Sequence, residues 1–163
     1  MGYLIILLPS LLLSWTLTLN SYLQLPSSSH ELIRLTKALS APHRISNEMV
    51  AILLVETMAG TIKGKPNHIC GPFQTNAFLL RTKYDLLQST EEVCDILESS
   101  PYMAIKSALD NFLYWVHHSS SIEQAVLRYN RGWYPSSHDT EYLSRYYTAI
   151  QVIREYDDYI SKE

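Results

Sequence analysis

Seven consecutive apolar residues, Met49 to Val55, lead directly into Glu56. An apolar run without a polar break predicts a helix that is buried on most of its sides. Helical spacing places Glu56 on the same stripe as Met49, Ile52 and Leu53, so its carboxylate is expected to lose hydration. Lost hydration would raise the pKa of this carboxyl group and let it hold a proton near neutral pH. The alternative is a boundary glutamate that reaches solvent or pairs with a cation.

The size and charge of the chain narrow the functional classes. Its 163 residues suit one domain with an end segment, and the formal net charge of −3 gives no sign of a nucleic-acid partner. There are only 5 glycines, and no phosphate-binding or dinucleotide-binding glycine motif occurs. The sequence therefore predicts neither a nucleotide cofactor nor nucleic-acid binding.

The N-terminus reads as a targeting segment. Residues 3–19 carry no charge, and the first charged side chain is Glu31. The stretch is at the lower limit for spanning a bilayer, so residues 1–26 are predicted to form a signal peptide or an inner-membrane anchor with a short linker. The alternative, a buried first helix of the domain, is disfavoured by Pro9. An exported, periplasmic domain is expected over residues 27–163.

Two cysteines, Cys70 and Cys94, are a plausible disulfide pair in an exported chain, although two buried thiols would fit the sequence as well. No CxxC spacing or Cys/His cluster suggests zinc, and the sequence predicts no metal site.

The exported part is predicted to be all-helical. A capping box, Ser28-x-x-Glu31, is expected to open the first helix, and Gly60 is expected to end the helix that carries Glu56. A loop rich in glycine and proline follows. Further helices are predicted over residues 76–87, 91–97, 100–117, 120–128 and from 139 nearly to the end, with a loop over 129–138. An orthogonally packed helical domain is the expected fold.

Four short blocks occur in order along the chain: Val55-Glu56-Thr57, Gly71-Pro72-Phe73-Gln74, Tyr129-Asn130-Arg131-Gly132 and Thr140-Glu141-Tyr142-Leu143. Together they resemble the signature blocks of the lytic transglycosylase (SLT) family in the lysozyme-like superfamily, and they cover most of the exported part. The blocks also depart from the family pattern. Thr57 replaces the family serine, Pro72-Phe73 replaces Leu-Met, and Arg131 replaces an alanine. These replacements affect the expected contacts with the sugar more than the expected chemistry.

The resemblance implies a lysozyme-like fold with a substrate cleft. It also implies cleavage of the β-1,4 bond between N-acetylmuramic acid and N-acetylglucosamine in peptidoglycan, with a 1,6-anhydro product. Glu56 would be the single catalytic acid and base, and no cofactor is implied. The implied substrate-binding residues, with side chains suited to sugar hydrogen bonds or stacking, are Thr57, Phe73, Gln74, Tyr129, Asn130, Trp133 and Tyr142.

Other interpretations stay open at this point. A distant acid, Asp139 or Glu141, could fold close to Glu56 and support a hydrolytic, lysozyme-type reaction. The same scaffold could serve a non-catalytic protein that binds the cell wall during assembly, or a membrane-anchored helical scaffold without a glycan role. Small enzymes that resemble this family often open the wall locally. The expected partners, besides peptidoglycan strands, are therefore a secretion or conjugation machine or, for a virion-associated protein, the machinery by which a phage enters.

Overall fold

The computed structural model describes residues 16–61, 68–134, 136 and 138–162. The first fifteen residues of the predicted signal or anchor segment lie outside this description. Among the described residues no helix is both long enough and apolar enough to cross a membrane.

The described chain is mostly helical, as predicted. Its α-helices are α1 (Leu19–Leu23), α2 (Ser27–Ser40), α3 (Ser46–Thr57), α4 (Ala77–Lys83), α5 (Thr90–Ser99), α6 (Pro101–His117), α7 (Ile122–Arg131) and α8 (Asp139–Ile160). A short 3₁₀ helix, η1 (Ala41–His43), follows α2, and two short strands, β1 (Ile69–Cys70) and β2 (Thr75–Asn76), form an antiparallel pair. Residues 69 and 76 are Cα partners in this pair.

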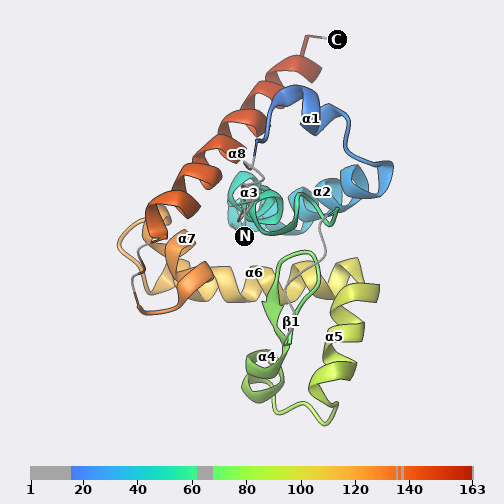
Figure 1. Ribbon diagram of the computed structural model, residues 1–163, viewed down its shortest axis with the longest axis vertical. Helices are drawn as coiled ribbons and strands as arrows, with labels where there is room; N and C mark the ends of the chain where they lie inside the picture. Colours follow the sequence, from blue (N-terminus) through green and yellow to red (C-terminus); the bar gives the residue numbers. More distant parts are fainter. Residues whose placement is uncertain (1–15, 62–67, 135, 137, 163) are drawn as a thin grey trace, which may run out of the picture.

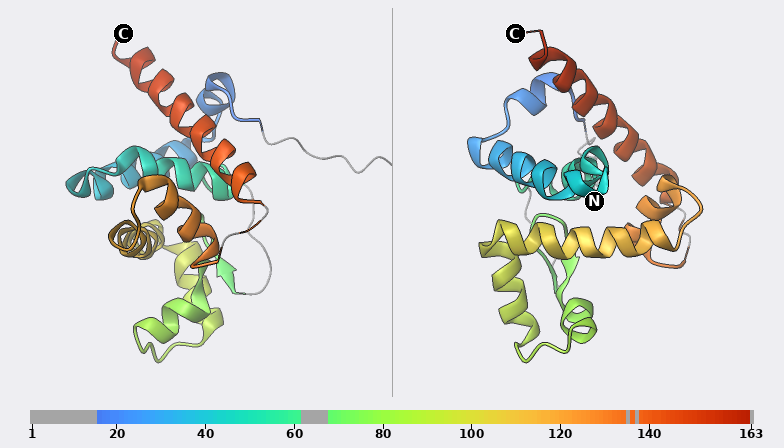
Figure 2. Two further views of the ribbon diagram at one scale, coloured as in Figure 1. Left: turned by 90° about the vertical axis from the view of Figure 1, so that its left-hand side faces the viewer. Right: turned by 180° about the vertical axis from the view of Figure 1, so that it is seen from behind.

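Helix α3 is the centre of the main core. Each residue from Met49 to Leu54 has no exposed surface, which confirms the buried helix that the apolar run predicts. Helices α2 and α8 pack against it, and α6 crosses the middle of the molecule (Figure 1). Helices α1, α2, α3 and α8 lie on one side of α6, and the strand pair with α4 and α5 lies on the other, as Figure 2 also shows.

The smaller side of the molecule has its own core and a covalent link. Cys70, Ala77, Val93 and Leu97 form this second cluster, apart from the main one. Cys70 and Cys94 are joined by a disulfide, which fastens β1 to α5. The bridge that the sequence left open is thus present in the structure.

Residues before the predicted domain boundary also belong to the core. Leu17 is 4% exposed and Tyr22 is fully buried, although both precede Ser27. The Tyr22 ring lies 4.9 Å from the ring of Tyr156 on α8 and 5.8 Å edge-on from His30 on α2. Helix α1 therefore packs against the C-terminal part of α8 (Figure 1).

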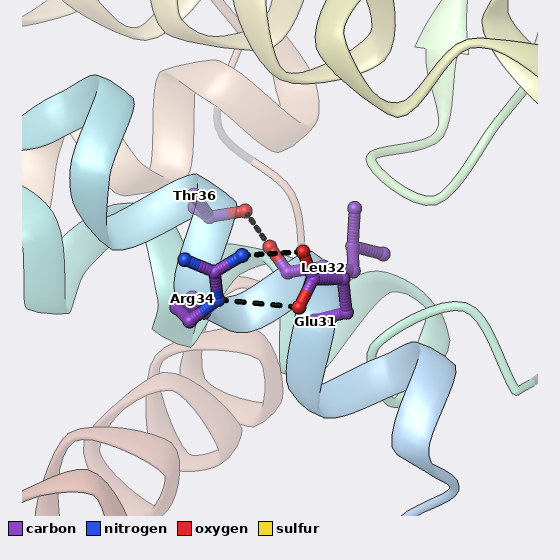
Figure 3. Close-up of polar contacts among 4 residues, drawn as sticks. All are labelled: Glu31, Leu32, Arg34 and Thr36. Carbon is purple, nitrogen blue, oxygen red and sulfur yellow. Dashed lines mark hydrogen bonds and ion pairs between the residues drawn. The ribbon is translucent and has the colours of Figure 1, made fainter.

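Several predicted helix ends were wrong. Ser28 does not cap α2; Glu31 instead accepts two hydrogen bonds from Arg34, at 2.5 and 3.2 Å, while the Thr36 hydroxyl donates to the Leu32 carbonyl (Figure 3). Helix α3 ends at Thr57, and its C-cap residue Met58 adopts a left-handed conformation two residues before the expected Gly60. Helix α4 stops at Lys83, and Leu87 is almost fully exposed.

Helix α7 also differs from its prediction, and this difference matters for the site. Its N-cap is Ser121, whose hydroxyl accepts from the Gln124 amide, so the helix begins at Ile122 and not at the predicted residue 120. The helix continues to Arg131 and ends at Gly132, whose φ of 73° favours glycine. Tyr129 and Asn130 are therefore helical residues with fixed directions, and not members of a loop.

Candidate functional site

A pocket of about 230 Å³ opens where the C-terminal ends of α3 and α7 meet the N-terminal end of α8. Most of its walls are charged or polar. The lining residues are Val55, Glu56, Asn130, Arg131, His138, Glu141, Tyr142 and Arg145.

Glu56 is the residue on which this pocket converges. The Tyr142 hydroxyl donates to Glu56 Oε1 at 2.6 Å, and the Asn130 side-chain amide donates to the same oxygen at 3.5 Å. The carboxyl group is half-buried at the end of the buried helix α3, as its place after the apolar run predicts. Donors from α7 and α8 therefore fix the orientation of the carboxyl group, and both approach it through Oε1.

The loop before β2 is bonded to the ends of α3 and α7. The Thr57 hydroxyl donates to the Pro72 carbonyl at 2.7 Å and accepts from the Gly60 amide at 2.9 Å. The Tyr129 hydroxyl donates to the Phe73 carbonyl at 3.1 Å. These bonds join the first three sequence blocks into one assembly around Glu56.

The same loop depends on Gly71. Its φ is +70°, and a Cβ atom added to it would lie 2.8 Å from the Leu97 carbonyl oxygen of α5. No side chain fits at that distance, so the close approach of the loop to α5 requires glycine. Gln74 follows with φ of 50°, and its amide donates to the Gly71 carbonyl at 2.9 Å.

The structure separates the predicted site residues into two groups. Glu56, Asn130 and Tyr142 line the pocket. Thr57 and Phe73 are 1% and 0% exposed, and their recorded bonds shape the neighbouring loop. Tyr129 and Gln74 also bond loop carbonyls and do not line the pocket.

Trp133 does not line the pocket. It is 53% exposed, and its ring packs edge-on against Trp115 of α6 at 5.1 Å. The guanidinium of Arg128 covers the ring at 4.6 Å from its centroid. One face of the Trp133 ring is therefore covered by the Arg128 side chain.

Besides Val55, four pocket residues had no predicted binding role: Arg131, His138, Glu141 and Arg145. Glu141 had been considered only as a distant acid, and here it lines the same pocket as Glu56 and forms an ion pair with Arg145. Residues 141, 142 and 145 lie on one face of a helix. The predicted role of Tyr142 therefore indicated that Glu141 and Arg145 could also lie at the site.

Burial and charge keep the two tyrosines of the site protonated. Burial, followed by the nearby charge of Glu56, raises the pKa of the Tyr129 phenol above its ordinary value. The same causes and the hydrogen bond to Glu56 raise the pKa of Tyr142 well above that value. Tyr142 therefore remains a hydrogen-bond donor to Glu56 throughout the neutral range.

Buried tyrosines should limit the stability of the protein at alkaline pH. Burial raises the pKa of Tyr22, Tyr129, Tyr142 and Tyr146 in the folded state. The folded state thus keeps protons that the unfolded state releases above pH ~10, so the contribution of these tyrosines to stability is constant below that pH and falls above it. The loss approaches ~1.4 kcal/mol per pH unit for each tyrosine.

We expect cooperative unfolding between about pH 10 and 12, since four such losses over two units reach the total stability of a typical domain. Circular dichroism and tyrosinate absorbance, followed together against pH, check this result. Ionisation of every tyrosine with no loss of structure would contradict the assigned burial.

Comparison with known proteins adds no assignment: no protein-family model, no curated protein and no solved structure matches this chain. Within the described part of the chain, no group of three or more His, Cys, Asp or Glu side chains could hold a metal ion. The possible chemistry of the pocket therefore follows from the side chains that line it. A half-buried carboxyl, oriented by a phenol and an amide, can donate and accept a proton.

Proposed function

We propose that this protein is a peptidoglycan lytic transglycosylase with a lysozyme-like helical domain. One observation carries the proposal. Asn130 and Tyr142 lie 74 and 86 residues from Glu56 along the chain, yet both donate to its carboxyl group. These residues come from three of the blocks that resemble the lytic transglycosylase family, and a chance resemblance gives no reason for them to meet.

In the proposed reaction Glu56 acts twice. It first protonates the glycosidic oxygen between N-acetylmuramic acid and N-acetylglucosamine, and the bond from this oxygen to the anomeric carbon breaks. The 6-hydroxyl of the muramic acid then attacks the anomeric carbon and returns its proton to Glu56. The product is a 1,6-anhydro sugar, no water is consumed, and the substrate acetamido group assists in place of a second carboxylate.

The other groups of the site orient this carboxyl group. Tyr142 and Asn130 both donate to Oε1 of Glu56 and so limit the directions that the carboxyl group can take. Tyr129, Thr57 and the loop carbonyls hold the end of α3 in place relative to α7. Preorganised donors of this kind cost no reorganisation when charge moves during the reaction.

The disulfide supports a place outside the cytoplasm, because such bonds persist in oxidising compartments. We therefore propose that the enzyme acts on the wall from the periplasm, released or held at the inner membrane. Local opening of the wall for a secretion, conjugation or phage machine is the proposed role.

A second candidate is a lysozyme-type hydrolase, and one observation favours it. Glu141 lines the same pocket as Glu56, and a second carboxylate is what hydrolysis through water or a covalent intermediate uses. Digestion of peptidoglycan in water enriched in heavy oxygen separates the two reactions. A hydrolase places the heavy oxygen on the new muramic end, whereas the proposed enzyme places none there.

Tyr142→Phe should reduce turnover by about 10-fold while the protein stays folded. The substitution removes a 2.6 Å hydrogen bond to a charged group, which is a strong class of hydrogen bond. The initial rate of peptidoglycan solubilisation measures the effect. Tyr147→Phe on the same helix is the matched control, since its hydroxyl bonds the exposed Glu123 and the rate should not change. Equal rates for both variants would remove the orienting role of Tyr142.

A further inference from the structure

The Cys70–Cys94 disulfide lies directly before the loop of residues 71–74, which is bonded to the ends of α3 and α7 and is called the supporting loop below. Cys94 belongs to α5. The first residue of the loop, Gly71, also lies against α5, since a Cβ atom on it would be 2.8 Å from a backbone oxygen of that helix. The disulfide and this close approach therefore fasten the start of the supporting loop to one helix.

The rest of the supporting loop contacts residues that adjoin the pocket. The Pro72 carbonyl accepts a hydrogen bond from Thr57, the residue after Glu56, at 2.7 Å. The Phe73 carbonyl accepts from the Tyr129 hydroxyl at 3.1 Å, and Tyr129 directly precedes the asparagine that donates to the pocket carboxyl group. A displacement of the loop would therefore change the support of both helix ends that position the carboxyl group and its amide donor.

Only a small apolar cluster accompanies the disulfide in this part of the molecule. Its buried members are Cys70, Ala77, Val93 and Leu97, and they are separate from the main core that contains α3. Small side chains such as Ala and Cys remove little apolar area from water and so contribute little stabilisation. The disulfide also closes a loop with a sequence separation of 24 residues, and breaking it returns chain entropy to the opened state. We therefore expect this part to open locally after reduction while the main core stays folded.

Of the two cysteines, Cys94 is the more accessible to a reagent. Cys94 is half-buried, whereas Cys70 is only 4% exposed. A thiolate of a dithiol reductant can attack the Cys94 sulfur, and Cys70 then leaves as a thiolate. The second sulfur of the reductant displaces Cys94, so the reductant becomes a disulfide and transfers two electrons, and its two protons end on the cysteine thiols. A disulfide donor reverses both steps.

We infer that the Cys70–Cys94 disulfide is a redox switch for the site of Glu56. The oxidised chain is active, and the reduced chain keeps its main core but has a displaced supporting loop and a low rate of cleavage. This inference rests on the proposed function. The switch keeps the enzyme inactive in a reducing compartment such as the cytoplasm and activates it in an oxidising one, where disulfides persist.

The test compares the full chain in three states: oxidised, reduced by dithiothreitol, and re-oxidised by oxidised glutathione. The initial rate of peptidoglycan solubilisation measures activity, and hydrogen exchange of backbone amides, followed by mass spectrometry of peptides, measures local opening. The matched control carries both Cys70→Ala and Cys94→Ala. Because the chain has only 2 cysteines, neither reagent has a group to act on in this variant, and its rate should be the same in all three conditions.

We expect reduction to lower the rate on the order of 10²-fold, the usual effect of a misplacement of about 1 Å at a catalytic site. Re-oxidation should restore the rate, and the double variant should have the low rate of the reduced chain. The amides of residues 68–77 and of α5 should exchange faster in the reduced chain, while those of α3 and α8 stay protected.

Three results would overturn the inference, and they differ in what they say about the enzyme. If the oxidised and reduced chains cleave peptidoglycan at the same rate, the disulfide is not a switch and the proposed function stands. If reduction exposes the amides of α3 as much as those of the supporting loop, the disulfide stabilises the whole domain, and the proposed function again stands. If the folded, oxidised chain does not cleave peptidoglycan, both the inference and the proposed function are wrong.

Discussion

Glu56→Gln should lower the rate of glycan cleavage by at least ~10³-fold, because the proposed reaction uses this one carboxyl group as both acid and base. Glutamine is nearly isosteric, and its amide oxygen can still accept the hydrogen bonds from Tyr142 and Asn130 that reach Oε1. The folded structure and thermal stability should therefore be retained. The initial rate of peptidoglycan solubilisation and a thermal melt measure the two effects on the same sample.

Glu141→Gln is the matched control, since it neutralises the second carboxylate of the same pocket. For the proposed lytic reaction its rate should stay within about 10-fold of the original protein, which is small beside the loss of a general acid. A folded Glu56→Gln variant that keeps its activity would remove the central role of Glu56. A loss of equal size from Glu141→Gln would favour the two-carboxylate hydrolase.

Tyr22→Ala should destabilise the domain by about 3–5 kcal/mol, the usual cost of truncating a large buried aromatic side chain. Tyr22 is fully buried between Tyr156 of α8 and His30 of α2, so the truncation leaves a cavity between these helices. The expected fall in melting temperature is of order 10 °C for a chain of this size. Chemical denaturation, fitted for the free energy of unfolding, measures the loss.

Tyr134→Ala provides the control for Tyr22, because Tyr134 is 82% exposed and its truncation should change stability by less than about 0.5 kcal/mol. If Tyr22→Ala were as mild as this control, α1 would contribute nothing to the stability of the domain. The expected large effect would instead mean that a protein beginning at Ser27 lacks part of its core, and that assays need the residues before it.

The sequence was most informative where a local pattern decides the structure. The apolar run predicted the buried helix α3, and the helix predicted over residues 100–117 matches α6, whose N-cap Ser100 accepts a hydrogen bond from the Met103 amide. Local patterns were less reliable at helix ends, where more than one local arrangement is possible. Glu31 pairs with Arg34 instead of completing a capping box, and Met58 takes the conformation expected of Gly60.

The site was predictable in its centre and less so in its walls. Glu56, Asn130 and Tyr142 line one pocket, but no local pattern says that Tyr129 bonds the Phe73 carbonyl, 56 residues away, instead of Glu56. Burial of Thr57 and Phe73 likewise depends on how the loop packs against α3 and α5. Arg131 could be noticed from the sequence only as a departure from the family pattern, and its place in the pocket required the fold.

The most direct test of the account is mass spectrometry of the fragments released from purified peptidoglycan by the full chain. The account predicts muropeptides with 1,6-anhydro ends, each lighter by one water than the hydrolytic product, and none of them with the Glu56→Gln variant. Fragments with reducing muramic ends would contradict the lytic reaction, and the absence of any fragments from the folded protein would contradict a catalytic role.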